Sequence, residues 1–180
     1  MQIYQPAEDS YLLSETIKKH LKNKNKDIKI LDMGSGSGIQ AQTCKQLGFR
    51  DILTADINKK SIKSLKKQGF KTIHTNLFEN ISKKTKFNLI IFNPPYLPES
   101  KYDKKLDTTG GKQGYETIIS FLNQATSHLL PNSEILLLFS SFSKPNIIKQ
   151  KAKELGYKYK LLSKKKLFFE ELYVYILTLK

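Results

Sequence analysis

Four consecutive residues, Asn93-Pro94-Pro95-Tyr96, have side chains and spacing suited to binding a planar amino group. They directly follow residues 88–92, a short apolar run that predicts a buried strand. Because proline fixes φ and lacks a backbone N–H, a strand cannot continue its hydrogen-bond ladder through Pro94 and Pro95. Their carbonyls and the Asn93 side-chain oxygen then form a rigid group of acceptors beside the Tyr96 ring. This stretch fits a planar –NH2 group, although Asn-Pro also starts ordinary turns.

A glycine-rich turn at residues 32–38 lies between a predicted strand and a predicted helix. Its glycines, Gly34, Gly36 and Gly38, are spaced by two, unlike the Gly-x-Gly-x-x-Gly of dinucleotide enzymes, and they allow close approach to the backbone. Asp32 stands before the first glycine. A carboxylate there suits a ligand with an ammonium or sulfonium charge better than a pyrophosphate.

Polar residues also end the next two predicted strands. Asp56 lies 20 residues after Gly36, where an acidic residue accepts from both ribose hydroxyls, and Asn76 is placed to accept from an adenine amino group. The carboxyl ends of parallel strands meet at one sheet edge, so we expect Asp32, Asp56, Asn76 and Asn93 to line one ligand crevice. The alternative is that they are only turn residues, which Asp and Asn often are.

Strands alternate with helices along the chain, which predicts a parallel sheet with right-handed crossovers. The last two strands are joined by a connection too short for a helix, which favours an antiparallel pair at the sheet edge. We therefore predict one α/β domain over residues 1–180, with a Rossmann-like sheet of seven strands and helices on both faces. The expected strands are 28–32, 51–56, 71–75, 88–92, 134–139, 157–162 and 172–179, and the expected helices are 10–21, 39–47, 59–68, 115–130 and 145–155.

Composition narrows the class of protein further. Hydrophobic residues make up 39% of the chain and no apolar run approaches the ~20 residues of a membrane span, so we expect a globular cytoplasmic protein without membrane contact. One cysteine, Cys44, and three histidines argue against an internal metal site. The net charge of +15 favours a partner that is RNA or is bound to RNA. Arg50 is the only arginine, however, and specific phosphate recognition favours arginine.

With these motifs in hand, the chain resembles the class I S-adenosylmethionine-dependent methyltransferases. Within them it is similar to the HemK-type glutamine methyltransferases, in the archaeal and eukaryotic branch that modifies class 1 translation termination factors. The resemblance is carried by residues 4–13, 32–38, 93–96, 110–114 and 168–172. Of these, 93–96 is shared with amino-group methylases of adenine and guanine.

The resemblance implies S-adenosylmethionine as cofactor and S-adenosylhomocysteine as product. It implies cofactor contacts from Ser10, Asp32, Gly34, Gly36, Gly38, Asp56, Asn76, Leu77 and Asn93, and contacts to the methyl acceptor from Asn93, Pro94, Pro95 and Tyr96. Two positions depart from the family pattern. Asn76 stands where the family usually has Asp, and Thr108-Thr109 stands where an aromatic usually precedes the double glycine.

The implied reaction is N5-methylation of the glutamine in the Gly-Gly-Gln motif of a class 1 release factor. The resemblance also implies a small zinc-binding activator subunit as partner. We expect residues 71–75 to form a sheet edge, to which a partner could add a strand unless lysines simply shield it.

Two alternatives to this function remain open. One is an N6-adenine or N2-guanine methyltransferase of RNA or DNA, with Tyr96 stacked on a flipped base. The other is a catalytically silent cofactor-binding scaffold.

Overall fold

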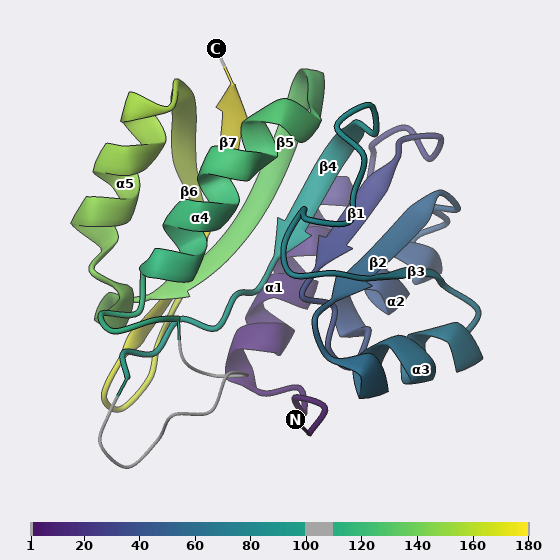
Figure 1. Ribbon diagram of the computed structural model, residues 1–180. Helices are drawn as coiled ribbons and strands as arrows, with labels where there is room; N and C mark the ends of the chain where they lie inside the picture. The colour runs from purple at the N-terminus through teal and green to yellow at the C-terminus, as the bar shows by residue number, and fades with distance from the viewer. Residues whose placement is uncertain (1, 100–109, 180) are drawn as a thin grey trace.

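A computed structural model describes residues 2–99 and 110–179 of the chain, and a single sheet of seven strands runs through this part (Figure 1). Its order is β3-β2-β1-β4-β5-β7-β6. The strands are β1 Ile30–Met33, β2 Ile52–Asp56, β3 Lys71–His74, β4 Phe87–Phe92, β5 Leu129–Ser140, β6 Tyr157–Lys166 and β7 Glu171–Leu179. Strands β1 to β5 pair in parallel, whereas β7 is antiparallel to both β5 and β6. The Rossmann-like fold predicted from the sequence is confirmed.

Helices cover both faces of the sheet. They are α1 Glu8–Leu21, α2 Ile39–Gln46, α3 Lys59–Lys67, α4 Glu116–Ala125 and α5 Pro145–Glu154, with short 3-10 turns η1 Thr126–His128 and η2 Ser141–Ser143. Figure 1 shows α4 and α5 in front of the sheet, and α1 and α2 behind it. In α1, apolar residues four apart (Leu13, Ile17 and Leu21) are fully buried, as expected for a helix that packs one face on a sheet.

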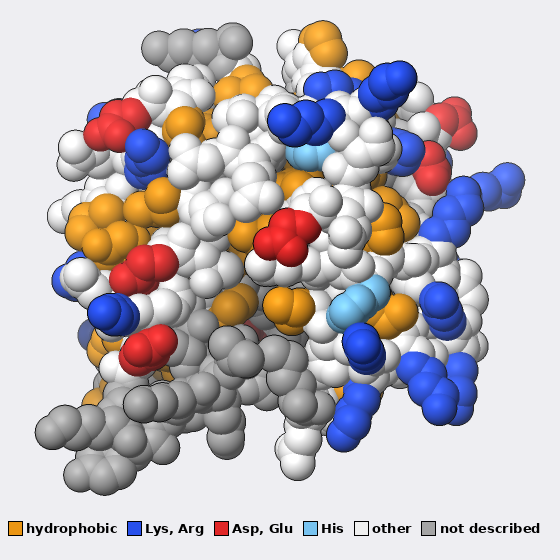
Figure 2. All heavy atoms as spheres, in the orientation of Figure 1, with side chains coloured by type: hydrophobic (Ala, Val, Ile, Leu, Met, Phe, Trp, Pro, Cys, Tyr) orange, Lys and Arg blue, Asp and Glu red, His pale blue; other side chains and the backbone are white. Residues whose placement is uncertain are grey.

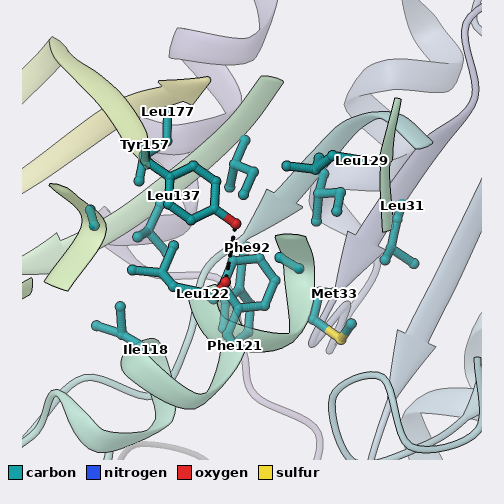
Figure 3. Packing of buried hydrophobic residues seen from close by; sticks show 14 of the residues in the cluster. Leu31, Met33, Phe92, Ile118, Phe121, Leu122, Leu129, Leu137, Tyr157 and Leu177 are labelled. Atoms are coloured by element: carbon teal, nitrogen blue, oxygen red, sulfur yellow. Dashed lines mark hydrogen bonds between the residues drawn. The ribbon is translucent and has the colours of Figure 1, made fainter. Parts of the chain in front are cut away.

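Strand β4 supplies side chains to the core on both sides of the sheet. Phe92 packs on the α4 face, where its ring centroid lies 4.4 Å from that of Phe121, and Ile91 packs on the α1 face. Figure 3 shows the α4 side, where the Tyr157 hydroxyl donates a 3.1 Å hydrogen bond to the carbonyl of Leu122. Because β4 is central and buried on both faces, it is a rigid support for the residues that follow it.

Three predicted elements differ most in extent from the structure. The helix expected to run to residue 130 ends at Ala125 and gives way to η1, and β5 begins at Leu129 instead of near residue 134. The reason is tertiary: Leu129 pairs with Phe87 of β4, and the register shifts beyond this pair so that Pro131 is accommodated. Strand β6 likewise extends to Lys166, because β7 supplies a pairing partner to residues without an apolar pattern.

Some expectations fall outside the described residues, among them the departure at Thr108-Thr109, which belongs to positions 100–109 of the loop between β4 and α4. In the described parts of the chain, no helix is long and apolar enough to cross a membrane. Within the same parts, no group of three or more His, Cys, Asp or Glu side chains is arranged to hold a metal ion.

Candidate functional site

A cavity of about 270 Å³ opens at the carboxyl ends of β1, β2 and β4. Its lining includes all the residues predicted for cofactor and acceptor binding with one exception. The lining members of that set are Ser10, Asp32, Gly34, Gly36, Asp56, Asn76, Leu77, Asn93, Pro94, Pro95 and Tyr96. The exception is Gly38, which lies outside the lining. The parallel sheet has therefore brought together side chains that are up to 86 positions apart, since Ser10 and Tyr96 line the same cavity.

The glycine-rich turn forms the floor of this cavity beside β4. Gly34 has φ +61°, and a Cβ built on it would lie 3.2 Å from Cε2 of Phe92, so a side chain there would crowd the end of β4. Gly38 has φ +90°, and its Cβ would lie 2.8 Å from Cδ2 of Leu65. Gly38 thus lets the start of α2 pack closely on α3, which explains why it does not face the cavity.

Two buried carboxylates face the cavity from the ends of β1 and β2. Asp32 is 1% exposed and accepts a 3.1 Å hydrogen bond from the Ala41 backbone N–H in α2. Burial raises the pKa of Asp32 to about 7, and the nearby Asp56 charge adds to the increase. Burial also raises the pKa of Asp56, whose oxygens accept from the backbone N–H groups of Gly36 and Asn58, both at 2.7 Å. A bound cation would lower the pKa values of both Asp32 and Asp56, since an opposite charge favours the ionised form.

Residues 76 and 77 follow β3 at the side of the cavity. The side-chain nitrogen of Asn76 donates to the Glu79 carboxylate at 2.8 Å, so its oxygen is the group left to accept from a ligand. This contact preserves an acceptor at a position where the family usually has Asp. Leu77 has φ +45°, an unusual conformation for a residue with a side chain, and it also lines the cavity.

At the end of β4, the Asn93 amide is held by a residue that the sequence analysis did not assign to the site. Its nitrogen donates to the Asp9 carboxylate at 3.0 Å, and its oxygen, Oδ1, is buried without a hydrogen-bond partner among the described residues. Asp9 also accepts from the Ser10 backbone N–H at 2.6 Å and from the Tyr4 hydroxyl at 3.1 Å. Because a carboxylate can only accept, the nitrogen end of Asn93 must face it, which leaves the oxygen available to a ligand.

The backbone of the Asn-Pro-Pro-Tyr segment is braced from outside the cavity. A Cβ built on Gly110 would lie 2.6 Å from the Pro95 carbonyl oxygen, so the Gly110 backbone crowds that carbonyl. The Gly110 N–H donates to the Leu97 carbonyl at 2.9 Å, and the Ser143 hydroxyl donates to the Tyr96 carbonyl at 3.1 Å. Of the two proline carbonyls proposed as acceptors, that of Pro94 is consequently the better candidate.

The side chain of Tyr96 belongs to the core and to the cavity at once. It packs against both hydrophobic clusters and also lines the cavity. Burial raises the pKa of its hydroxyl above the ordinary value of a tyrosine, so the phenol is neutral at physiological pH. Tyr96 therefore offers a neutral aromatic surface to whatever enters, and its placement does not depend on a ligand.

Asp9 and Gln40 are among the lining residues that the sequence analysis did not assign to the site. Asp9 lies within residues 4–13, which carry the family resemblance, but no role was assigned to it, and the spacing between Asp9 and Asn93 carries no local signal. Gln40 is 3% exposed and donates to the Ser10 carbonyl at 3.0 Å, while its oxygen is buried without a partner among the described residues. The site thus contains two buried oxygens without a hydrogen-bond partner among the described residues, Oδ1 of Asn93 at the end of β4 and Oε1 of Gln40 in α2.

A doubly wound sheet with a glycine-rich turn after β1 and acidic residues after β1 and β2 defines the class of nucleoside-cofactor-binding α/β proteins. More specifically, the sequence profile of the methyltransferase small domain family matches residues 8–167. The chain belongs to this family.

One relative is a protein from Methanocaldococcus jannaschii named as a candidate protein N5-glutamine methyltransferase. It is 36% identical over 96% of this chain and 90% of its own length. Among solved structures, the E. cuniculi Mtq2-Trm112 complex, described as methylating the termination factor eRF1, matches with a TM-score of 0.83 at 22% identity, covering 100% of both chains. A T. thermophilus 16S rRNA N2 G1207 methyltransferase matches with a TM-score of 0.70 at 20% identity, covering 98% of this chain and 44% of that one. These structural likenesses confirm the fold.

Proposed function

We propose that this protein is an S-adenosylmethionine-dependent methyltransferase that methylates the side-chain nitrogen N5 of the glutamine in the Gly-Gly-Gln motif of a class 1 release factor. The observation that carries the proposal is the unpaired, buried Oδ1 of Asn93 at the end of β4. A buried acceptor without a partner is costly, and a donor from the substrate would satisfy it. We further propose that the chain acts as a single domain and in the cytoplasm, where release factors work.

The residues present fit the proposed cofactor. Asp56 would accept from the ribose hydroxyls, Asn76 from the adenine amino group, and Asp32 would lie near the positive charges of the amino acid end. The glycine-rich turn lacks side chains that would keep this end of the ligand away from the backbone. When bound, the cofactor supplies a methyl group on a positively charged sulfur, which is a good leaving group.

The acceptor end of the site suits a weak nucleophile. An amide nitrogen has its lone pair delocalised into the carbonyl, so it needs orientation more than a strong base. In this proposal Asn93 Oδ1 and the Pro94 carbonyl accept the two N–H bonds, which turns the lone pair toward the methyl group. A bound S-adenosylmethionine would supply the methyl group to this nitrogen and would leave as S-adenosylhomocysteine. The surplus proton on nitrogen then passes to water.

Two observations favour a protein acceptor over a nucleic acid. The M. jannaschii relative, similar over nearly its whole length, carries the name of a protein glutamine methyltransferase. In addition, the buried Asp9 carboxylate beside Asn93 gives the acceptor end a negative charge, which repels phosphate.

The nucleic-acid alternative has its own support and remains the second candidate. The net charge is +15, and Figure 2 shows Lys and Arg side chains gathered on the right of this face, over α3, whose lysines are 59, 60, 63, 66 and 67. A related fold is found in an rRNA methyltransferase. In our proposal this basic surface has a lesser role, an indirect contact with RNA while the release factor is near the ribosome.

We propose a small zinc-binding activator subunit as partner, seated along β3. This strand pairs only with β2 in the described structure, and it is a sheet edge as predicted. Its outer residues are exposed or half-buried, so its free backbone groups can accept an added strand. The structural neighbour from E. cuniculi is itself a two-protein complex. Size-exclusion chromatography of the chain with and without the subunit tests this part.

Methyl transfer from tritiated cofactor tests the acceptor directly. Purified release factor, rRNA, tRNA and DNA are each offered to the chain, alone and with the activator subunit, and peptide mass spectrometry then locates the label. We expect label on the release-factor glutamine, and less by about a hundredfold or more when the wild type is replaced by Asn93→Ala. Label on nucleic acid without label on the factor would reject the proposal in favour of the second candidate.

A further inference from the structure

The turn between β6 and β7 presents two phenylalanines to solvent. Phe168 is 91% exposed and Phe169 is 81% exposed, and their rings stand edge to face with centroids 4.6 Å apart. The turn itself is closed by the Leu167 N–H, which donates to the Glu170 carbonyl at 2.7 Å. The central positions of such turns favour Gly, Asn, Asp, Ser or Pro, so the two aromatic rings serve neither the turn nor the core. Exposed aromatic side chains of this kind are characteristic of binding surfaces.

This turn is tied to the acceptor end of the cavity by contacts on two sides. Lys165, before the turn, forms an ion pair with Glu8 at the start of α1, next to Asp9. Glu171, after the turn, donates its backbone N–H to the Ser141 hydroxyl of η2 at 3.1 Å. The same 3-10 turn holds the acceptor loop, because Ser143 donates to the Tyr96 carbonyl. The aromatic pair therefore stands on a fixed support close to Asn93 and Tyr96.

The charges around the turn identify the kind of partner. One oxygen of Glu170 is buried without a hydrogen-bond partner among the described residues, and burial raises the pKa of Glu170, with a further contribution from the charge of nearby Asp9. Two of the neighbouring lysines are themselves paired, Lys164 with Glu171 and Lys165 with Glu8, while the charge of Lys166 acts on Glu171. Carboxylates repel a phosphate backbone, whereas Glu170 and Asp9, which form no ion pair among the described residues, attract basic groups of a protein.

We propose that Phe168 and Phe169 are a docking element for the protein that accepts the methyl group. The two rings insert into an apolar depression on the surface of that protein as its target side chain enters the cavity. This inference rests on the proposed function and deepens it, because it separates recognition of the whole protein from the transfer step. Each buried aromatic ring removes roughly 150–250 Å² from water, so a pair of rings can anchor a transient complex. The docking element affects the affinity for the acceptor protein, and cofactor binding does not depend on it.

The test is steady-state methylation of intact release factor by the double variant Phe168→Ser/Phe169→Ser. We expect KM to rise about tenfold or more with kcat changed less than twofold. The affinity for S-adenosylhomocysteine and the unfolding temperature should match the wild type, since both rings are outside the core and the cavity. The matched control is Ile147→Ser on α5, an exposed apolar residue (37% exposed) on another element, which should keep the wild-type KM. The double variant Phe168→Leu/Phe169→Leu should recover most of the affinity.

The outcomes separate this inference from the proposed function. A wild type that labels only nucleic acid contradicts the proposed function itself. A wild type that methylates the release factor with a KM equal to that of the serine variant contradicts only the docking element. Sedimentation of the chain alone tests whether a second copy of the chain, in place of the acceptor protein, covers the two rings. A concentration-dependent dimer that the serine variant abolishes would show that the rings cover a second copy of the chain, and this result would also overturn the inference.

Discussion

The Asp9 carboxylate lies 3.0 Å from the side-chain nitrogen of Asn93, and this contact fixes which end of the Asn93 amide is left without a partner among the described residues. The two residues are 84 positions apart and are joined only by the packing of α1 behind β4. With Asp9 in place, the oxygen of the Asn93 amide is the end that accepts from the substrate in the proposed reaction. Without it, nothing in that contact distinguishes the two ends of the amide.

Asp9→Asn should therefore lower turnover while cofactor binding persists. The new amide can donate to the Asn93 oxygen, which turns Asn93 over and places an N–H where the acceptor nitrogen needs an oxygen. We expect kcat to fall by about ten- to a hundredfold. Calorimetry with S-adenosylhomocysteine provides the second readout, and its affinity should change by less than about threefold. An equal loss of affinity and turnover would mean that Asp9 acts on the cofactor side of the site.

Asn93→Ala should reduce turnover more strongly than Asp9→Asn, because it removes the proposed acceptor altogether. The expected loss is about 10²–10³ in kcat, the range seen when one oriented polar group is removed from a catalytic site. The affinity for S-adenosylhomocysteine should stay close to that of the wild type. Full methylation activity in this variant would refute the proposed mechanism.

Asp56→Ala should weaken cofactor binding by a few kcal/mol at most, because each charge-assisted hydrogen bond to a ribose hydroxyl contributes about 1.5–3 kcal/mol. Asp56 also holds the Gly36 N–H at 2.7 Å, so part of the effect would come from a less ordered glycine-rich turn. Asp56→Asn retains an acceptor oxygen and should lose less. Titration calorimetry measures both variants, and unchanged affinity in Asp56→Ala would reject the ribose assignment.

Cofactor affinity should depend on pH through Asp32. Its pKa in the free protein is raised to about 7, so below that pH the residue is mostly protonated and neutral. Binding of a cation favours the ionised form, and a proton must then leave. Affinity for S-adenosylmethionine should fall as pH drops below about 7, by at most tenfold per pH unit, and level off above it. Comparing pH profiles is the check, since Asp32→Asn should flatten this part of the curve.

Gly110→Ala should impair the acceptor end from outside the cavity. The added Cβ would lie 2.6 Å from the Pro95 carbonyl oxygen and 2.6 Å from that of Gly114, so the braced loop must shift. We expect about a tenfold loss of kcat, because small displacements of positioned groups reduce rates strongly. Gly48→Ala is the control: its Cβ would meet no atom within 4 Å, and its cost is the backbone strain of an alanine at φ +92°. The control should lose some stability and keep its activity, as an assay at low temperature would show.

The sequence by itself determined where β1 to β4, the strands that carry the site, end, to within one residue. Each of Asp32, Asp56 and Asn93 directly follows or closes a short apolar run, and such runs are local features that survive in any packing. Alternation of strands and helices then requires a parallel sheet, whose carboxyl ends meet at one edge. The cavity and the place of Asp32, Asp56, Asn76 and Asn93 in its lining could therefore be predicted without coordinates, whereas Ser10 and Leu77 were implied by the family resemblance.

Only the tertiary structure decided how these groups are oriented and where some elements begin. The early start of β5 depends on the pairing of Leu129 with Phe87, and the packing of Gly38 depends on Leu65 of α3. The orientation of the Asn93 amide depends on Asp9, which lies far away in the chain. Hydrogen bonds and close contacts between distant segments leave no periodic pattern in a sequence, because they require particular positions in space and not a particular local order of residues.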